Sequence, residues 1–239
     1  MSDVLQEIKK NNTPINAPPP PRAKIVVCIC SLDTVLLRWV VRMYAPLLRG
    51  RPNLSFQHMI RFTASPHSIG QKRDGFVMWM LQNAPDATHI FFLDNDVILE
   101  GGMDILDAID QMVKLDLDIV SGCIRTKKPP DLEIMLYKQD KEKHFHALKS
   151  IDFTKKTIEV DGVGAGFLLI KKDMFYKIQR PWFQVHTLEE TMTEDIEFCL
   201  RAKKAGYKIY AYTGVHLSHI GYFAVRLDQL IGDVWSEAQ

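Results

Sequence analysis

The chain has 239 residues, of which 46% are hydrophobic and 25% are charged, and its formal net charge is +1. This length and composition are typical of a globular protein with a sizeable core. The near-neutral charge gives no global electrostatic reason to expect nucleic acid or an anionic membrane as the main partner. No run of about 18 apolar residues occurs, and the N-terminal residues lack the apolar segment of a signal peptide. The sequence therefore predicts a cytoplasmic protein with no stable membrane insertion.

Residues 1–22 differ in composition from the rest of the chain, because Pro14 is followed by a run of four prolines from Pro18 to Pro21. A proline run of this kind is extended and semi-rigid. We predict a flexible proline-rich tail over residues 1–22 and a single domain over residues 23–239. A ligand for a proline-recognition module is the alternative for the tail.

From residue 24 onward, strand-like and helix-like segments alternate. Short apolar or β-branched runs predict strands at residues 24–30, 54–62, 89–93, 118–124 and 208–212. Apolar residues at helical spacing predict helices at residues 35–48, 69–81, 105–113, 191–205 and 227–234. Further short strands are predicted at residues 133–137, 145–151, 157–160 and 167–170. This order predicts an α/β fold with a mainly parallel central sheet, helices on both faces and a smaller antiparallel extension.

Two carboxylates, Asp94 and Asp96, follow the apolar run 89–93 on either side of Asn95. They lie where the carboxyl end of a parallel strand opens into a binding crevice. Mg²⁺ and Mn²⁺ prefer oxygen ligands, often one or two carboxylates completed by water and the phosphates of a substrate. The pair therefore predicts a nucleoside diphosphate held through a cation. A solvated acidic turn that caps the following helix is the alternative.

A glycine-rich segment, residues 161–166, carries Gly162, Gly164 and Gly166 at alternate positions. A dinucleotide-binding loop leads from a strand into a helix, whereas this segment leads into the apolar run 167–170. A Rossmann cofactor site is therefore disfavoured. Because glycine permits close approach of a ligand to the backbone, the segment predicts a floor beneath a bound sugar or phosphate, with a bulged turn between strands as the alternative.

Acidic side chains open the predicted helix at residues 191–205, where Thr191 and Glu194 have capping-box spacing. Capping alone explains these residues. In the functional interpretation, a carboxylate at this helix start faces the crevice and removes a proton from an acceptor hydroxyl or orients the acceptor. Both hold at once if Glu194 caps the helix and Asp195 reaches inward.

Two histidines, His216 and His219, follow the last predicted strand. A lone histidine in such a place is more often a hydrogen-bonding residue than a metal ligand. Two of them at the end of a strand, in a chain that already has a carboxylate pair, favour a metal role. We expect His219 to be the ligand.

The order of these segments resembles the GT-A type glycosyltransferases, particularly those grouped with family 2. The resemblance covers roughly residues 23–222 and rests on Phe91–Asp96, Gly164–Phe167, Glu194–Asp195, Phe198–Ala202, Ala205–Tyr207 and His219–Gly221. It implies a GT-A-like fold in which Asp94, Asp96 and His219 hold Mn²⁺ or Mg²⁺ on the diphosphate of a nucleotide-sugar. Asp96 would be the principal ligand, and Asp94 would lie near the ribose or the metal.

The same resemblance implies that the nucleobase lies near the end of the first strand and that Arg73 lies near the diphosphate, with a solvated basic turn as the alternative for Arg73. The donor-binding residues are then Ser31, Asp33, Arg73, Asp94, Asn95, Gly164 and Gly166.

The implied reaction transfers a sugar from a nucleoside-diphosphate sugar, with a UDP-sugar favoured, to a hydroxyl of a glycan, a small molecule or a modified nucleic acid base. A single transfer is expected, since the chain lacks the Gln-x-x-Arg-Trp sequence and the membrane span typical of processive synthases of this family. Asp195 is the candidate base if the reaction inverts the anomeric centre, and Glu194 is the neighbouring catalytic candidate. Trp182, Phe183 and His186 are candidates for stacking on the acceptor; core packing is the alternative, and we prefer it for Phe183.

Two other classes compete with this interpretation. A nucleotidyltransferase acting on a sugar phosphate commonly carries a glycine- and basic-rich loop after its first strand, and residues 31–34 show none. A non-catalytic sugar-binding module would have the fold without turnover.

Overall fold

The computed structural model describes residues 22–31, 36–62, 69–126, 133–183 and 193–220. The segment predicted as an N-terminal tail, apart from Arg22, lies outside these ranges. The predicted helix at residues 227–234 lies outside them too.

An eight-stranded sheet forms the centre of the described part of the chain, in the order β2-β1-β3-β10-β5-β11-β4, with β8 paired to β11. Its strands are β1 (Ala23–Ser31), β2 (Leu54–Phe62), β3 (His89–Asp94), β4 (Val97–Leu99), β5 (Ile119–Ile124), β8 (Thr157–Val160), β10 (Phe167–Lys171) and β11 (Ile209–His219). β1 is parallel to β2 and to β3, and β5 is parallel to β11, whereas β10 runs antiparallel between β3 and β5. β2, β1, β3, β5 and β11 therefore point the same way, and we call the edge where they end the carboxyl edge. A three-stranded sheet of β6 (Leu136–Gln139), β7 (Phe145–Ala147) and β9 (Gly162–Val163) lies beside it.

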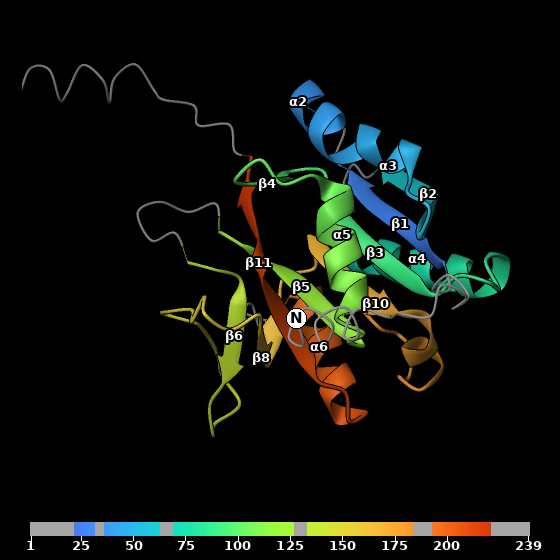
Figure 1. Cartoon of the computed structure of the whole chain (residues 1–239). Coiled ribbons are helices and arrows are strands. Elements are labelled where there is room, and N and C mark those ends of the chain that lie inside the picture. The colour runs from blue at the N-terminus through green and yellow to red at the C-terminus, as the bar shows by residue number, and fades with distance from the viewer. Residues whose placement is uncertain (1–21, 32–35, 63–68, 127–132, 184–192, 221–239) are drawn as a thin grey trace, which may run out of the picture.

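Helices cover both faces of the large sheet (Figure 1). They are α2 (Leu37–Trp39), the π-helix η1 (Val40–Tyr44), α3 (Ala45–Arg49), α4 (Ile69–Asn83), α5 (Ile105–Lys114), the 3₁₀-helix η3 (Lys172–Tyr176) and α6 (Glu194–Lys204). Successive residues of a strand point to opposite faces, so Ile25 and Val27 of β1 pack with the α2–α3 segment and α5, while Val26 and Cys28 pack with α4 and α6. The predicted arrangement of helices on both faces is confirmed.

The sheet is less parallel than predicted, because β10, β4 and β8 run antiparallel within it and not only in a separate extension. The last predicted strand, residues 208–212, is β11 and continues to His219. Its end pairs with β4, a three-residue strand that was not predicted. The two histidines thus lie in a strand, and the prediction that they follow it is wrong.

The predicted capping box at the start of α6 is also wrong. The residue that precedes the helix is Thr193, not Thr191, and its side chain makes no capping hydrogen bond. The Thr193 hydroxyl donates to the Asp195 carboxylate instead. Thr191 itself lies outside the described residues.

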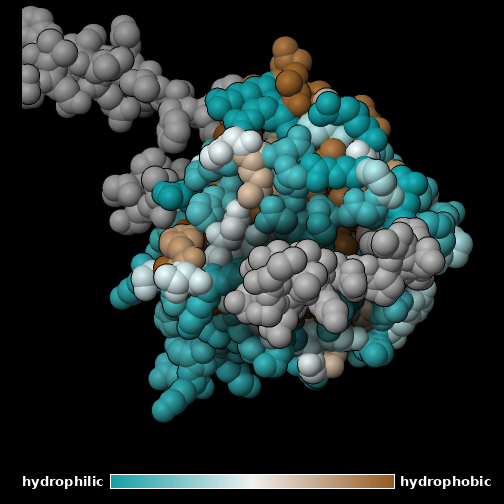
Figure 2. All heavy atoms as spheres, viewed as in Figure 1, coloured by the Kyte–Doolittle hydropathy of each residue, from teal (hydrophilic) through white to brown (hydrophobic). Residues whose placement is uncertain are grey.

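The four cysteines are free and buried. None of the described helices is long and apolar enough to cross a bilayer. The face seen in Figure 2 is largely hydrophilic, with apolar side chains gathered over α2. The large apolar side chains exposed on the α2–α3 segment are Leu37, Val41 and Leu48.

Candidate active site

The carboxyl edge brings together residues that are far apart in the sequence. Ser31 ends β1, Asp94 ends β3, and Asn95 and Asp96 follow immediately. The Asn95 amide donates to the Ser31 hydroxyl over 2.9 Å, which ties the two strand ends to each other. The structure thus places the predicted donor-binding residues Ser31 and Asn95 side by side, at the edge where ligands bind in sheets of this type.

Asp96 and His219 meet through the backbone. β4 pairs antiparallel with the end of β11, so that Val97 lies opposite His219, and the Ile220 N–H donates to the carbonyl oxygen of Asp96 over 2.6 Å. The Nδ1 atom of His219 contacts the carbonyl oxygen of Arg125. A ring nitrogen that faces a carbonyl carries the proton, which leaves Nε2 as the atom able to bind a metal.

His216 is engaged elsewhere. Its Nε2 atom contacts the carbonyl oxygen of Thr213 over 2.7 Å, and its ring meets the edge of Phe153 with 5.1 Å between centroids. The placement of His219 beside Asp96 agrees with the choice of His219 over His216, although its role as a ligand stays a prediction.

Asp94, Asp96 and His219 do not converge tightly. In the described part of the chain, the one group of three such residues with ligand atoms all within 4.8 Å of one another is Asp140, Glu142 and His144. These exposed residues lie on the turn between β6 and β7. In the sequence, lysines alternate with these residues, and that pattern is typical of an ordinary solvated turn.

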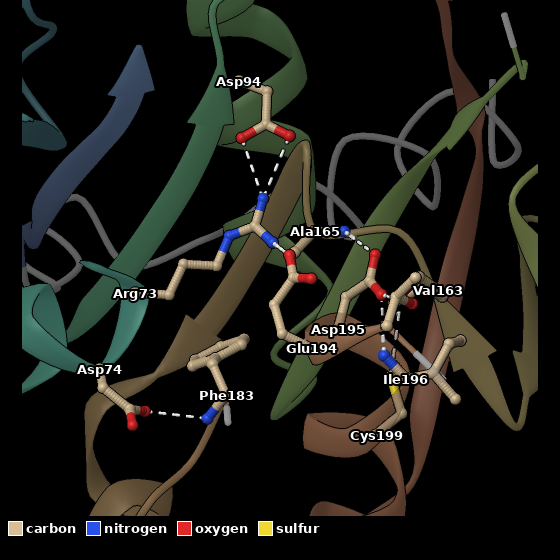
Figure 3. A network of polar contacts seen from close by, with 11 residues as sticks. Arg73, Asp74, Asp94, Val163, Ala165, Phe183, Glu194, Asp195, Ile196 and Cys199 are labelled. Atoms are coloured by element: carbon tan, nitrogen blue, oxygen red, sulfur yellow. Dashed lines mark hydrogen bonds and ion pairs between the residues drawn. The ribbon is translucent and has the colours of Figure 1, made fainter. Parts of the chain in front are cut away.

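Arg73 of α4 lies at the centre of a network of carboxylates (Figure 3). Its Nη2 atom donates to both oxygens of Asp94, at 3.0 and 3.1 Å, and its Nη1 atom donates to Glu194. The side chain is only 3% exposed, and its guanidinium lies over the ring of Phe92, 5.9 Å from the centroid. The alternative of a solvated basic turn is therefore wrong. Arg73 reaches the site through Asp94 and joins α4, β3 and α6.

Burial and charge act against each other in this network. Burial raises the pKa of Asp94, and Arg73 opposes that increase. Burial also raises the pKa of Glu194, and Arg73 again opposes the increase. Burial alone would lower the pKa of Arg73, but Asp94 and Glu194 outweigh it and raise that pKa, so the guanidinium stays charged. One guanidinium faces two carboxylates, and this excess of negative charge suits a site that accepts a divalent cation.

Cys30 lies beside this network, but its thiol is not a candidate nucleophile. Burial raises the pKa of its thiol to about 11, although Arg73 partly offsets the effect. A thiol with so high a pKa is protonated at neutral pH and is a poor nucleophile.

Asp195 is buried next to the glycine-rich segment. Its Oδ2 atom accepts from the Ala165 N–H over 3.3 Å, and its Oδ1 atom accepts from the Ile196 N–H over 2.9 Å. Glu194, by contrast, turns toward Arg73 (Figure 3). The prediction that Asp195 reaches inward agrees with this geometry, while the capping role expected for Glu194 is replaced by the ion pair.

The glycines of the segment lie in tight places. A Cβ added at Gly166 would come 3.1 Å from Oδ2 of Asp94, and one added at Gly164 would come 2.9 Å from Cε of Met135. The carbonyl oxygen of Gly166 also accepts from the Asp94 N–H over 2.9 Å. Gly166 therefore lets the turn that leads into β10 lie directly against Asp94, which is compatible with both of the interpretations made from the sequence.

The predicted acceptor-binding aromatics pack in the core. Trp182 and Phe183 are 2% and 0% exposed, and their backbone N–H groups donate to Oδ1 of Asp74 at 2.9 and 2.8 Å. The stacking role predicted for Trp182 is therefore wrong, and the preferred core packing of Phe183 is confirmed. His186 and Asp33 lie outside the described residues.

No family model and no curated protein matches the chain. Solved structures do match it. Protein A197 from STIV superposes with a TM-score of 0.57 at 21% sequence identity, over 83% of this chain and 86% of that one. GalNAc-T7, whose crystal structure contains UDP, GalNAc and Mn²⁺, superposes with a TM-score of 0.52 at 11% identity, over 84% of this chain.

The fold is GT-A-like. The chain spans only 44% of the GalNAc-T7 chain that it matches, and these identities establish similarity of fold alone.

Proposed function

We propose that the protein is a glycosyltransferase that moves a sugar from a nucleoside-diphosphate sugar to an acceptor hydroxyl in a single, cation-dependent transfer. The observation that carries the proposal is that Ser31, Asp94, Asp96 and His219 all lie at the carboxyl edge of a GT-A-like sheet. A UDP-sugar is the favoured donor, because the GalNAc-T7 neighbour was crystallised with UDP, GalNAc and Mn²⁺.

The residues present suit Mn²⁺ or Mg²⁺. Asp96 and His219 would hold the ion, with Asp94 beside them, since carboxylate oxygens and an imidazole nitrogen are ligands that Mn²⁺ accepts. The contact of His219 Nδ1 with the Arg125 carbonyl would leave Nε2 available to bind the ion. When bound, the cation neutralises charge that develops on the leaving diphosphate.

On the donor side, Ser31 and Asn95 lie where the nucleoside would bind. Asp33, which lies outside the described residues, is proposed to bind the nucleoside with them. Gly166 and Gly164 would form the floor beneath the sugar or phosphate. Gly166 lies against the proposed cation site, since a Cβ there would come 3.1 Å from Oδ2 of Asp94. Arg73 would act on the diphosphate only through Asp94, since both of its Nη atoms are taken by carboxylates.

On the acceptor side, Asp195 is the proposed base. Its Oδ1 atom is held by the Ile196 N–H and the Thr193 hydroxyl, whereas Oδ2 has the longer contact with Ala165 and keeps a lone pair for the acceptor proton. Glu194 is a weaker candidate, because its carboxylate is already engaged by Nη1 of Arg73.

His219→Ala is expected to lower donor cleavage at limiting Mn²⁺ by about tenfold or more, whereas His216→Ala should change it less than twofold. The reason is that His219 lies beside Asp96, while the Nε2 atom of His216 is engaged with Thr213. The measurement is the initial rate of UDP release from a panel of UDP-sugars as Mn²⁺ is titrated.

A second reaction separates the competing classes. Release of pyrophosphate from UTP and a sugar 1-phosphate, with no release of UDP from UDP-sugars, would instead support a nucleotidyltransferase. Binding of UDP-sugars without cleavage would support a non-catalytic sugar-binding module. If His216→Ala has the larger effect, the ligand assignment passes to His216.

A further inference from the structure

Arg73 is held on a rigid support. One residue further along α4, Asp74 accepts hydrogen bonds from the backbone N–H groups of Trp182 and Phe183. One turn earlier, a Cβ at Gly70 would come 2.2 Å from the carbonyl oxygen of Phe183 and 3.1 Å from Cβ of Glu194. The α4 backbone at Arg73 is thus fixed against the 182–183 segment and the first residue of α6.

The guanidinium of Arg73 is divided between two partners. Asp94 receives both of its hydrogen bonds from Nη2, because Nη1 is taken by Glu194. The Nε atom is buried and has no hydrogen-bond partner among the described residues. A carboxylate that has an arginine to itself commonly binds two nitrogens of the fork in parallel. Glu194 therefore competes with Asp94 for the same guanidinium.

The two carboxylates belong to different sides of the site. Asp94 ends β3 at the proposed cation and diphosphate, and Glu194 opens α6 next to the proposed base Asp195. Their side chains are 24% and 22% exposed, against 3% for Arg73. A change in the strength of the pair between Arg73 and one of these carboxylates must therefore change the strength of its pair with the other.

We infer that Arg73 is a positioning residue that couples Asp94 on the donor side to Glu194 on the acceptor side, so that cation binding at Asp94 and the position of the start of α6 depend on each other. The inference rests on the proposed function for its cation. Coupling of this kind is reciprocal. A cation bound at Asp94 weakens the pair between Asp94 and Arg73 and so strengthens the pair between Arg73 and Glu194. Loss of Glu194 leaves Arg73 paired with Asp94 alone, which weakens cation binding at Asp94.

The first test measures the affinity for Mn²⁺ alone by electron paramagnetic resonance. Glu194→Gln is expected to weaken Mn²⁺ binding at least fivefold when Arg73 is present, and less than twofold in the Arg73→Lys background, since lysine cannot bridge both carboxylates. Glu197→Gln is the matched control, because Glu197 lies on the same helix and pairs with Arg201 at 2.7 Å. An equal effect of Glu194→Gln in both backgrounds would show that Glu194 acts through space and would overturn the inference.

The second test needs no metal. The loss of melting temperature in the double variant Asp94→Asn with Glu194→Gln should exceed the sum of the single losses by about 3 °C or more, because the buried guanidinium then has no hydrogen-bonded carboxylate. In the Arg73→Lys background, and for Asp94→Asn combined with Glu197→Gln, the losses should add. Additive losses of melting temperature with Arg73 in place would contradict the coupling of Asp94 and Glu194 through Arg73. If the losses exceed additivity but the protein binds no Mn²⁺, the coupling stands and the proposed cation site is wrong.

Discussion

Asp96→Asn is expected to reduce Mn²⁺-dependent cleavage of the nucleotide-sugar donor by about 100-fold or more, the loss that follows when a charged ligand of a catalytic cation becomes neutral. Asparagine keeps the shape of the side chain, and the contact that anchors this position runs from Ile220 to the backbone carbonyl oxygen of Asp96. The fold should therefore survive the change. The measurement is the rate of UDP release at saturating donor over a range of Mn²⁺ concentrations.

The control for this variant is Asp152→Asn. Asp152 lies in an exposed turn, where its carboxylate accepts from the N–H of Thr154, and asparagine can make the same contact. Its rate should match that of the parent protein. An Asp96→Asn protein that cleaves the donor at the parent rate would remove Asp96 from the cation site.

Arg73→Met is expected to lower the free energy of unfolding by about 3–5 kcal/mol, the cost of leaving partly buried carboxylates without their counter-charge. Methionine retains most of the apolar volume of the arginine stem, so the loss reports mainly on the pairs with Asp94 and Glu194. Arg73→Lys should fall between the parent and Arg73→Met, because lysine keeps the charge but not the fork. Denaturation in urea measures the difference.

Arg201→Met supplies the matched comparison. Arg201 pairs with Glu197 one turn away on α6, and its side chain is 20% exposed, so its removal should cost about 0.5–1 kcal/mol. If both variants lose the same free energy of unfolding, Arg73 forms only an ordinary ion pair, as Arg201 does, and does not hold the site together.

Much of the sheet was predictable because its strands are apolar and short. Residues 54–62 and 157–160 form strands with the predicted bounds, and β1 differs from its prediction by one residue at each end. Apolar runs with β-branched residues are buried on both faces in such sheets, as β1 and β3 are here, so local sequence is sufficient to locate them. The strand that ends at Asp94 was located in the same way.

The pairing of the strands was less predictable. β4 has three residues and forms only because the end of β11 lies beside it. The register shift in β11 between Tyr212 and His216 interrupts the strand pattern, so the sequence did not show that the strand continues to His219. Neither feature produces a periodic pattern in the sequence, since both depend on a partner far along the chain.

The site shows the same division. The carboxylates after β3 could be identified as candidates because their position follows from the strand before them. The ion pair between Arg73 and Glu194 joins residues 121 positions apart, and no local signal marks it. Trp182 was misassigned because a tryptophan after a proline looks the same in the sequence whether it faces a ligand or, as here, the core.

The most direct measurement of the central claim is calorimetric titration of the protein with UDP, in the presence of Mn²⁺ and again in the presence of EDTA. A cation held at Asp96 and His219 that in turn holds a diphosphate predicts saturable binding of UDP with Mn²⁺, at least tenfold weaker binding with EDTA, and loss of this difference in Asp96→Asn. Binding of UDP with the same affinity under both conditions, or no binding in either, would contradict the claim.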